Sequence, residues 1–149
     1  MQTAKDILQL KNIKETWSIR PEEWVFDALR LMSDKEVGAL MVINAKGKIV
    51  GIFSERDYAR RIILKGKASR ETRVEEIMTP AEKMYAIPAE TPLEDCMALM
   101  TDKHIRHLPV FDGHKFIGVV SIGDVVKTVI SEKQDVIDHL TNYIAGTYV

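Results

Sequence analysis

Two short segments of the chain carry the residues that could do chemistry. Residues 51–57 (GIFSERD) and 118–124 (GVVSIGD) each contain a glycine, two apolar residues, a serine, two further residues and an aspartate. Each segment lies where a predicted strand passes into a predicted helix. Asp57 and Asp124 would therefore lie beside an open helix N-terminus. A carboxylate has two acceptor oxygens, so it could accept hydrogen bonds from both hydroxyls of a ribose.

The same pattern also has a purely structural interpretation. Ser54 and Ser121 are good N-cap residues, and an acid three positions later stabilises the first helical turn. In a chain without further context this capping interpretation is the more common one. The two interpretations are compatible, because the serine can cap the helix while the aspartate still faces a ligand.

A phosphate next to such a ribose would need positive charge or unpaired N–H groups, and helix N-termini supply the latter. Arg56, Arg106 and His107 are the candidate charges. Gly123 removes a side chain beside Asp124 and leaves room for a bulkier ligand. The alternative for the charged residues is that they are solvated surface side chains.

The two segments belong to an internal repeat. Residues 19–42 match residues 87–110 at a shift of 68, with nine of the 24 positions identical. After a predicted hairpin turn the match resumes at a shift of 67, which aligns the serines and aspartates of the two segments with each other. The chemistry is therefore expected twice, once in each repeat.

Each repeat has the same predicted order of elements: a helix, two strands joined by a turn, and a second helix. Arg60 and Arg61 would form the charged face of the second helix of the first repeat. We expect strands over residues 39–43, 48–53, 108–111 and 115–120, helices over 55–64 and from 122, and small helices over 4–8 and 74–78.

This element content predicts a mixed α/β (α+β) fold. A three-stranded half is too small to bury its apolar face alone, whereas two copies packed face to face could, so we expect one pseudo-twofold domain. The expected divisions are 1–70 for the first repeat with its N-terminal helix, 71–133 for the second repeat, and 134–149 for a C-terminal helix or tail. An amphipathic pattern over 132–146, ended by Gly146, predicts a helix that packs on a partner subunit.

The motif, the element order and the repeat spacing together resemble those of CBS (cystathionine-β-synthase-type) domain pairs, and residues 105–110 (IRHLPV) resemble the second strand of that family. The resemblance covers roughly residues 3–133 and is strongest to two-repeat proteins without an attached enzyme. It implies tandem CBS repeats packed as one Bateman module, which dimerises and binds an adenine nucleotide as a regulatory signal. Asp57 and Asp124 match the ribose-binding aspartates of the family, and Arg106 and His107 match its basic residues before Leu-Pro-Val.

An adenine ring would need an apolar slot with backbone hydrogen bonds, and strand residues of both repeats are the candidates. For most of them core packing is the alternative, and both roles can hold together. Trp17 and Tyr85 align with each other and either stack on a base or cover the core. The full candidate set is Trp17, Ile19, Gly38, Ala39, Met41, Tyr85, Ile87, Leu108 and Pro109.

The two sites need not be alike. Arg56 aligns with Gly123, and residues 38–39 (Gly-Ala) align with residues 106–107 (Arg-His). Each site would therefore carry a different set of charges. One could take a mononucleotide and the other a longer ligand, so AMP, ADP, ATP, NAD(H) and S-adenosylmethionine all stay open.

Composition limits the other function classes. Lys plus Arg number 21 and Asp plus Glu number 22, which gives a net charge of −1 and no bulk attraction to nucleic acid or an anionic membrane. No apolar run approaches the length of a membrane span. The single cysteine, Cys96, permits no internal disulfide and reads as a buried, inert thiol. We therefore expect a cytoplasmic protein.

Three functions remain in competition. The leading one is a ligand-sensing module that signals the cellular energy or redox state to an unknown regulated protein. The second is a structural or partner-binding homodimer with no ligand, against which the presence of both aspartates argues. The third is a nucleotide-processing enzyme. We expect no enzyme and no metal, because the motif serines lack a His–Asp pairing and the spacing of His104 and His107 offers no third ligand.

Overall fold

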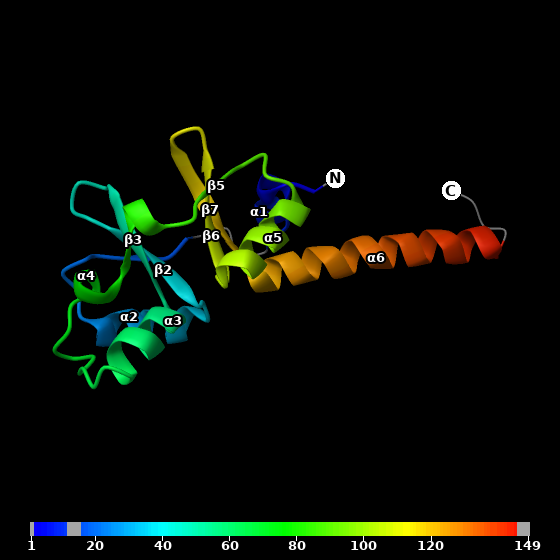
Figure 1. The fold of residues 1–149 in the computed structure, drawn as a ribbon. Coiled ribbons are helices and arrows are strands. Elements are labelled where there is room, and N and C mark those ends of the chain that lie inside the picture. Colours follow the sequence, from blue (N-terminus) through cyan, green and yellow to red (C-terminus); the bar gives the residue numbers. More distant parts are fainter. Residues whose placement is uncertain (1, 12–15, 146–149) are drawn as a thin grey trace. The chain divides into compact units, whose positions relative to one another are not determined.

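The computed structural model describes residues 2–11 and 16–145. Within it the chain divides into two compact units, which do not follow the order of the sequence. Unit 1 joins Met1–Lys14 to Ala86–Val149, and unit 2 is Glu15–Tyr85. Each unit has a small sheet, as the ribbon shows (Figure 1), and its own core of buried side chains.

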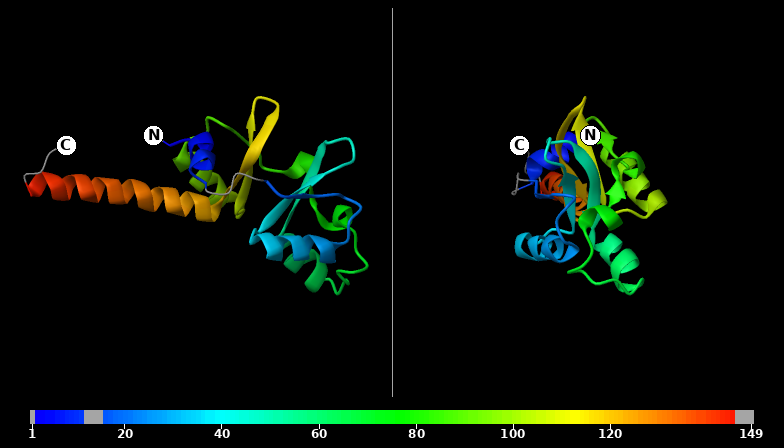
Figure 2. Two further views of the ribbon diagram at one scale, coloured as in Figure 1. Left: turned by 180° about the vertical axis from the view of Figure 1, so that it is seen from behind. Right: turned by 90° about the vertical axis from the view of Figure 1, so that its left-hand side faces the viewer.

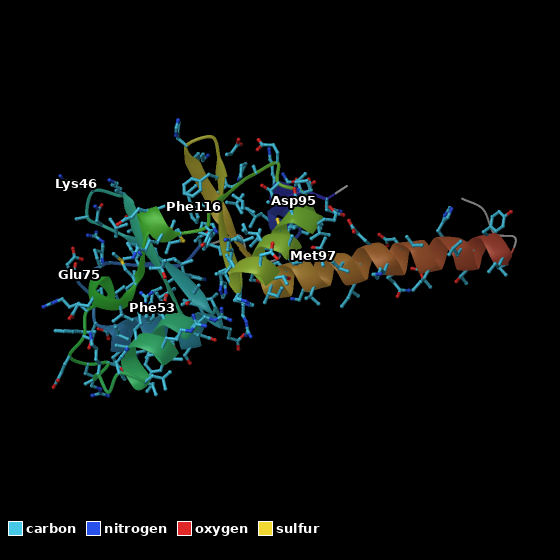
Figure 3. All side chains as sticks on the ribbon, viewed as in Figure 1. Lys46, Phe53, Glu75, Asp95, Met97 and Phe116 are labelled. Carbon is cyan, nitrogen blue, oxygen red and sulfur yellow. The ribbon has the colours of Figure 1, made fainter. Side chains whose placement is uncertain are left out.

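Unit 2 is built on a four-stranded sheet of order β1-β2-β3-β4, in which β1 is parallel to β2 and the other pairs are antiparallel. Its core side chains come from both strands and helices, and Phe53, labelled in Figure 3, is fully buried among them. The elements of the unit are β1 (Ser18–Ile19), α2 (Val25–Lys35), β2 (Ala39–Ile43), β3 (Ile49–Ser54), α3 (Glu55–Tyr58), the π-helical turn η1 (Ala59–Ile63), α4 (Val74–Ile77), β4 (Thr79–Pro80) and the 3₁₀ turn η2 (Ala81–Lys83).

Unit 1 has a three-stranded sheet of order β5-β6-β7, again with one parallel and one antiparallel pair. Its last helix is the longest element of the chain and runs without a break from the sheet past the rest of the unit (Figures 1 and 2). The elements are α1 (Ala4–Leu10), β5 (Ile87–Pro88), α5 (Leu93–Lys103), β6 (His107–Asp112), β7 (Lys115–Ser121) and α6 (Ile122–Ile144).

The packing of the two small helices explains why the units do not coincide with the sequence repeats. Helix α1 precedes the first repeat but packs in unit 1, where the Ala4 amide donates to the Thr91 carbonyl at 2.8 Å. Helix α4 precedes the second repeat but packs in unit 2, where the Val74 amide donates to the Glu23 carbonyl at 2.8 Å. The predicted N-terminal helix of the first repeat therefore completes the core of the other unit.

The first glycine of each motif permits this packing. A Cβ on Gly51 would lie 2.5 Å from the carbonyl oxygen of Thr79, and a Cβ on Gly118 would lie 3.1 Å from the Leu8 side chain. Gly118 also has a φ of +152°, a conformation that favours glycine. The packing at Gly51 and Gly118 therefore favours glycine at both positions, independently of any ligand.

Most predicted elements are confirmed. The strand over 39–43 and the small helices are present, the second strand of the first repeat ends one residue later at Ser54, and that of the second repeat ends at Ser121. The helix predicted over 55–64 is a short α-helix followed by a π-helical turn. The C-terminal helix predicted over 132–146 is continuous with the last helix of the second repeat, and Gly146 lies outside the described residues.

The mixed α/β fold with two small sheets agrees with the predicted class. The divisions at residues 70 and 133, and the face-to-face packing of the repeats, stay predictions. Among the described residues, no helix combines the length and apolar character needed to span a lipid bilayer.

Candidate functional site

In unit 2, Asp57 closes a capping box at the junction of β3 and α3. The Ser54 hydroxyl oxygen accepts a hydrogen bond from the Asp57 amide at 3.3 Å, and Oδ2 of Asp57 accepts one from the Ser54 amide at 3.0 Å. The Ser54 hydroxyl lies 3.2 Å from the same oxygen. The predicted capping interpretation is therefore confirmed for this serine and aspartate.

The second oxygen of Asp57 lies beside Thr79, which the sequence analysis did not consider, and beside Arg61, which it assigned to a charged helix face. The Thr79 hydroxyl donates to Oδ1 at 3.3 Å, and the guanidinium of Arg61 lies 4.0 Å from the same oxygen. Arg61 also donates to the carbonyls of Ile77 and Met78, each at 2.9 Å. The prediction that Arg61 is only part of a charged helix face is wrong, because it ties η1 to the end of α4 beside the candidate carboxylate.

In unit 1, Asp124 has the same cap but a different neighbour. The Ser121 amide donates to Oδ2 of Asp124 at 2.8 Å, and the Asp124 amide donates to the Ser121 hydroxyl at 3.2 Å. The ammonium of Lys11 lies 2.9 Å from that Oδ2 and also donates to the Val119 carbonyl at 3.0 Å. Asp124 is thus held by an ion pair where Asp57 is held by a hydroxyl.

The start of β2 in unit 2 and the start of β6 in unit 1 lie next to the cap of the same unit. In unit 2, Ala39 is the register partner of Ser54, and the Glu55 amide donates to the Gly38 carbonyl at 3.1 Å. The motif and the predicted residues of the first repeat therefore meet at one end of the sheet.

The same arrangement brings charged residues to the cap in unit 1. His107 is the register partner of Ser121, and the Ile122 amide donates to the Arg106 carbonyl at 2.9 Å. Arg106 is exposed and His107 is half-buried. The equivalence of residues 38–39 with 106–107, inferred from the repeat, agrees with these contacts.

The residues beside the two aspartates also differ. Arg56 is half-buried in the first turn of α3. Its counterpart Gly123 is exposed, and a Cβ there would meet only the Ser121 hydroxyl, at 3.7 Å. The surface of α6 next to Asp124 is therefore open, as the predicted room for a bulkier ligand requires.

The apolar candidates on β2 and β6 lie on two opposite faces of each strand. Leu40 and Val42 belong to the core of unit 2, so Ala39 and Met41 project from the opposite face of the sheet. In β6 the same alternation places Leu108 in the core of unit 1 and Pro109 on the other face. Ile87 is also a core residue. Leu108 and Ile87 could therefore serve a base only through their backbone groups.

Trp17 packs half-buried against the core of unit 2, together with Ile19. The Lys35 ammonium lies 4.4 Å from the centre of the Trp17 ring, and the Trp17 carbonyl accepts a hydrogen bond from the Met41 amide at 3.3 Å. These contacts favour the core-covering interpretation of Trp17. Tyr85 is 44% exposed, so the aligned aromatic residues have different surroundings.

A third capping box provides an internal comparison. Oδ2 of Asp6 accepts from the Thr3 amide at 3.0 Å, and the Asp6 amide donates to the Thr3 hydroxyl at 3.4 Å. The hydrogen bonds that Oδ2 accepts from the Thr3 amide and, at 2.9 Å, from the Thr3 hydroxyl lower the pKa of Asp6 below its usual value. The cap alone therefore does not mark a ligand site. Asp57 and Asp124 differ from Asp6 in lying at a strand end with a further donor on the carboxylate.

A family model described as CBS domain matches residues 3–64 and 74–131. The chain belongs to the CBS domain family. Both matched segments contain one Ser-x-x-Asp cap, so the module has two CBS repeats, as the repeat analysis predicted.

Named relatives support the assignment. The chain is 42% identical over 129 residues to the mitochondrial CBS domain-containing protein CBSX3 of Arabidopsis thaliana, which covers 85% of this chain and 63% of the relative. The chain thus spans less than two thirds of that protein. A putative signal-transduction protein with CBS domains from Burkholderia ambifaria MC40-6 has 44% identity and a TM-score of 0.82, covering 87% of this chain and 95% of that one.

One similar structure contains a nucleotide. CBSX2 in complex with AMP has 28% identity and a TM-score of 0.70, and the match covers 88% of this chain and 98% of CBSX2. These similarities identify the chain as a CBS-pair regulatory module.

Across residues 2–11 and 16–145, no group of three His, Cys, Asp or Glu residues is arranged to hold a metal ion.

Proposed function

We propose that this CBS pair binds an adenine nucleotide through the carboxylates of Asp57 and Asp124 and passes the signal to a regulated protein. The observation that carries the proposal is the repeated geometry. In both units a buried or half-buried aspartate lies at the end of the sheet, with one carboxylate oxygen engaged by the backbone amide of the capping serine. The AMP complex of the similar CBSX2 supports the choice of ligand class.

The charges indicate where phosphates would bind. In unit 1, Arg106 and His107 lie beside the cap, and the exposed Gly123 leaves space over the first turn of α6. In unit 2 the candidate cation is Arg56 in the first turn of α3, and Arg61 lies 4.0 Å from Asp57. AMP, ADP, ATP and NAD(H) all present a ribose diol and a phosphate to such a site, so the class of ligand is proposed and the individual compound is not.

The regulatory step follows from differential binding. A ligand that binds one arrangement of the module more tightly shifts the population toward that arrangement. We propose that the module works as a homodimer and has no catalytic role of its own. The cytoplasmic location predicted from composition stays a prediction, since the relative CBSX3 is named as mitochondrial.

A thermal-shift panel tests this proposal. A ligand that binds only the folded state stabilises it by about 2.7 kcal/mol at a hundredfold excess over Kd, so AMP, ATP or NADH should raise the Tm by several degrees. Asp57→Ala together with Asp124→Ala should abolish the rise. Asp6→Ala is the matched control, because it removes the same kind of cap away from the sheet ends and should leave the rise intact. No rise with any of these compounds at millimolar concentration would favour the alternative, a partner-binding module without a ligand.

A further inference from the structure

The outer part of α6 carries an apolar stripe that unit 1 does not cover. The helix has 23 residues, and its buried residues Val125 and Thr128 lie near its start. Past them the helix continues beyond the other elements of unit 1 (Figures 1 and 3). The family match ends at residue 131, so most of this stripe is an addition to the CBS repeat.

The stripe has the spacing of a coiled-coil seam. Its apolar members are each between 47% and 84% exposed, and they are Val126, Ile130, Ile137, Leu140 and Ile144. Together with Lys133 they are spaced by four, three, four, three and four residues. Such alternation of threes and fours keeps one face of a helix against a partner helix over several turns. The seam, by this definition, consists of Val126, Ile130, Lys133, Ile137, Leu140 and Ile144.

Lys133 decides which partner helix fits. In a parallel pair of copies in register, Lys133 would face the partner's Lys133, and two like charges would meet inside an apolar seam. In an antiparallel pair centred on Asp135, Lys133 lies opposite the partner's Ile137. The same centre places Ile130 opposite the partner's Leu140 and Val126 opposite the partner's Ile144.

We infer that α6 pairs antiparallel with α6 of a second copy of this chain, along this seam and centred on Asp135. The other apolar seam residues then meet apolar side chains, and Ile137 meets the partner's Lys133, whose stem can cover it while the ammonium reaches solvent. The inference specifies the homodimer in the proposed function but does not depend on nucleotide binding.

A pair of charge variants separates the two orientations. In the antiparallel pair Ile137→Glu faces the partner's Lys133, whereas Ile137→Lys brings two lysines together. Ile137→Lys should therefore raise the dimer Kd about tenfold or more above that of Ile137→Glu, measured by sedimentation over a dilution series. Ser131→Lys adds the same charge outside the seam and should leave the Kd unchanged. Equal Kd values for the two Ile137 variants would overturn the orientation.

Disulfide trapping provides a test that does not rely on affinity. In a Cys96→Ala background, Ile130→Cys and Leu140→Cys proteins are mixed, oxidised and digested without reduction, and the disulfide-linked peptides are identified by mass. The antiparallel pair predicts mixed dimers joined from position 130 to position 140. Dimers joined between identical positions, or a wild-type chain that sediments as a monomer, would overturn the inference. The thermal shift with AMP on the same variants reports separately on the proposed function.

Discussion

The ammonium nitrogen of Lys11 lies 2.9 Å from Oδ2 of Asp124, although 113 positions of the sequence separate the two residues. The contact joins the end of α1 to the first turn of α6, and a hydrogen bond of 3.0 Å from Lys11 to the Val119 carbonyl fixes the lysine from the β7 side. At Asp57 the ion-pair partner among the described residues is Arg61, whose guanidinium lies 4.0 Å from Oδ1.

This contact predicts an energetic coupling between Lys11 and Asp124. Lys11→Met should lower the free energy of unfolding by about 0.5–1 kcal/mol, because the pair is only partly buried. In the Asp124→Ala background the same substitution should cost clearly less, as urea denaturation of the four proteins would measure. Lys5→Met, on the exposed side of α1, is the control and should cost little in either background. Additive effects would mean that the ion pair does not form in solution.

Gly51 and Gly123 should respond to alanine in opposite directions. Gly51→Ala places a Cβ 2.5 Å from the Thr79 carbonyl, a backbone atom, so it should destabilise unit 2 by about 1–3 kcal/mol. Gly123→Ala lies in the first turn of α6 with open space around it and should stabilise by up to about 1 kcal/mol. Chemical denaturation checks both values. A neutral Gly51→Ala would show that α4 and β4 do not pack against β3 as closely as described.

Cys96 should be unreactive in the folded protein. It is fully buried in the core of unit 1, and burial raises the pKa of its thiol above the usual value, so little thiolate is present at neutral pH. Reaction with a chromogenic disulfide at pH 7.5 should be slow in buffer and rapid in urea. Fast modification of the native protein would contradict the described packing of α5.

Arg106 should act on the phosphate rather than on the nucleoside. It is exposed beside the unit 1 cap, so Arg106→Ala should leave the fold intact and weaken AMP about tenfold by removing a charge-assisted contact. Adenosine binding should change little, as titration calorimetry with both ligands would show. Lys115→Ala, an exposed cation on β7 outside the predicted site, is the matched control. An equal loss for AMP and adenosine would remove the phosphate role.

Periodicity and the internal repeat were enough to predict the longer strands β2, β3, β6 and β7 and the caps at Ser54 and Ser121, and the resemblance of the motif to CBS domain pairs indicated the family. The short strands β1, β4 and β5 were not predicted. Periodicity and the repeat could not predict that α1 completes the core of unit 1, because that depends on non-local contacts such as Ala4 with Thr91. The ion pair of Lys11 with Asp124 was not predicted for the same reason, since nothing near Lys11 in the sequence indicates Asp124. The π-helical turn at Ala59–Ile63 follows an ordinary helical pattern and has no sequence signal of its own.

The central claim is that Asp57 and Asp124 accept hydrogen bonds from a ribose, beyond capping their helices. Binding of AMP and 2′-deoxy-AMP to the wild type and to the two Asp→Ala proteins tests it most directly, because the comparison cancels any general effect on the fold. The account predicts that wild type binds 2′-deoxy-AMP about ten- to a hundredfold more weakly, and that this penalty nearly vanishes at the site whose aspartate is removed. Equal binding of AMP and 2′-deoxy-AMP to the wild type would contradict the ribose role of both aspartates.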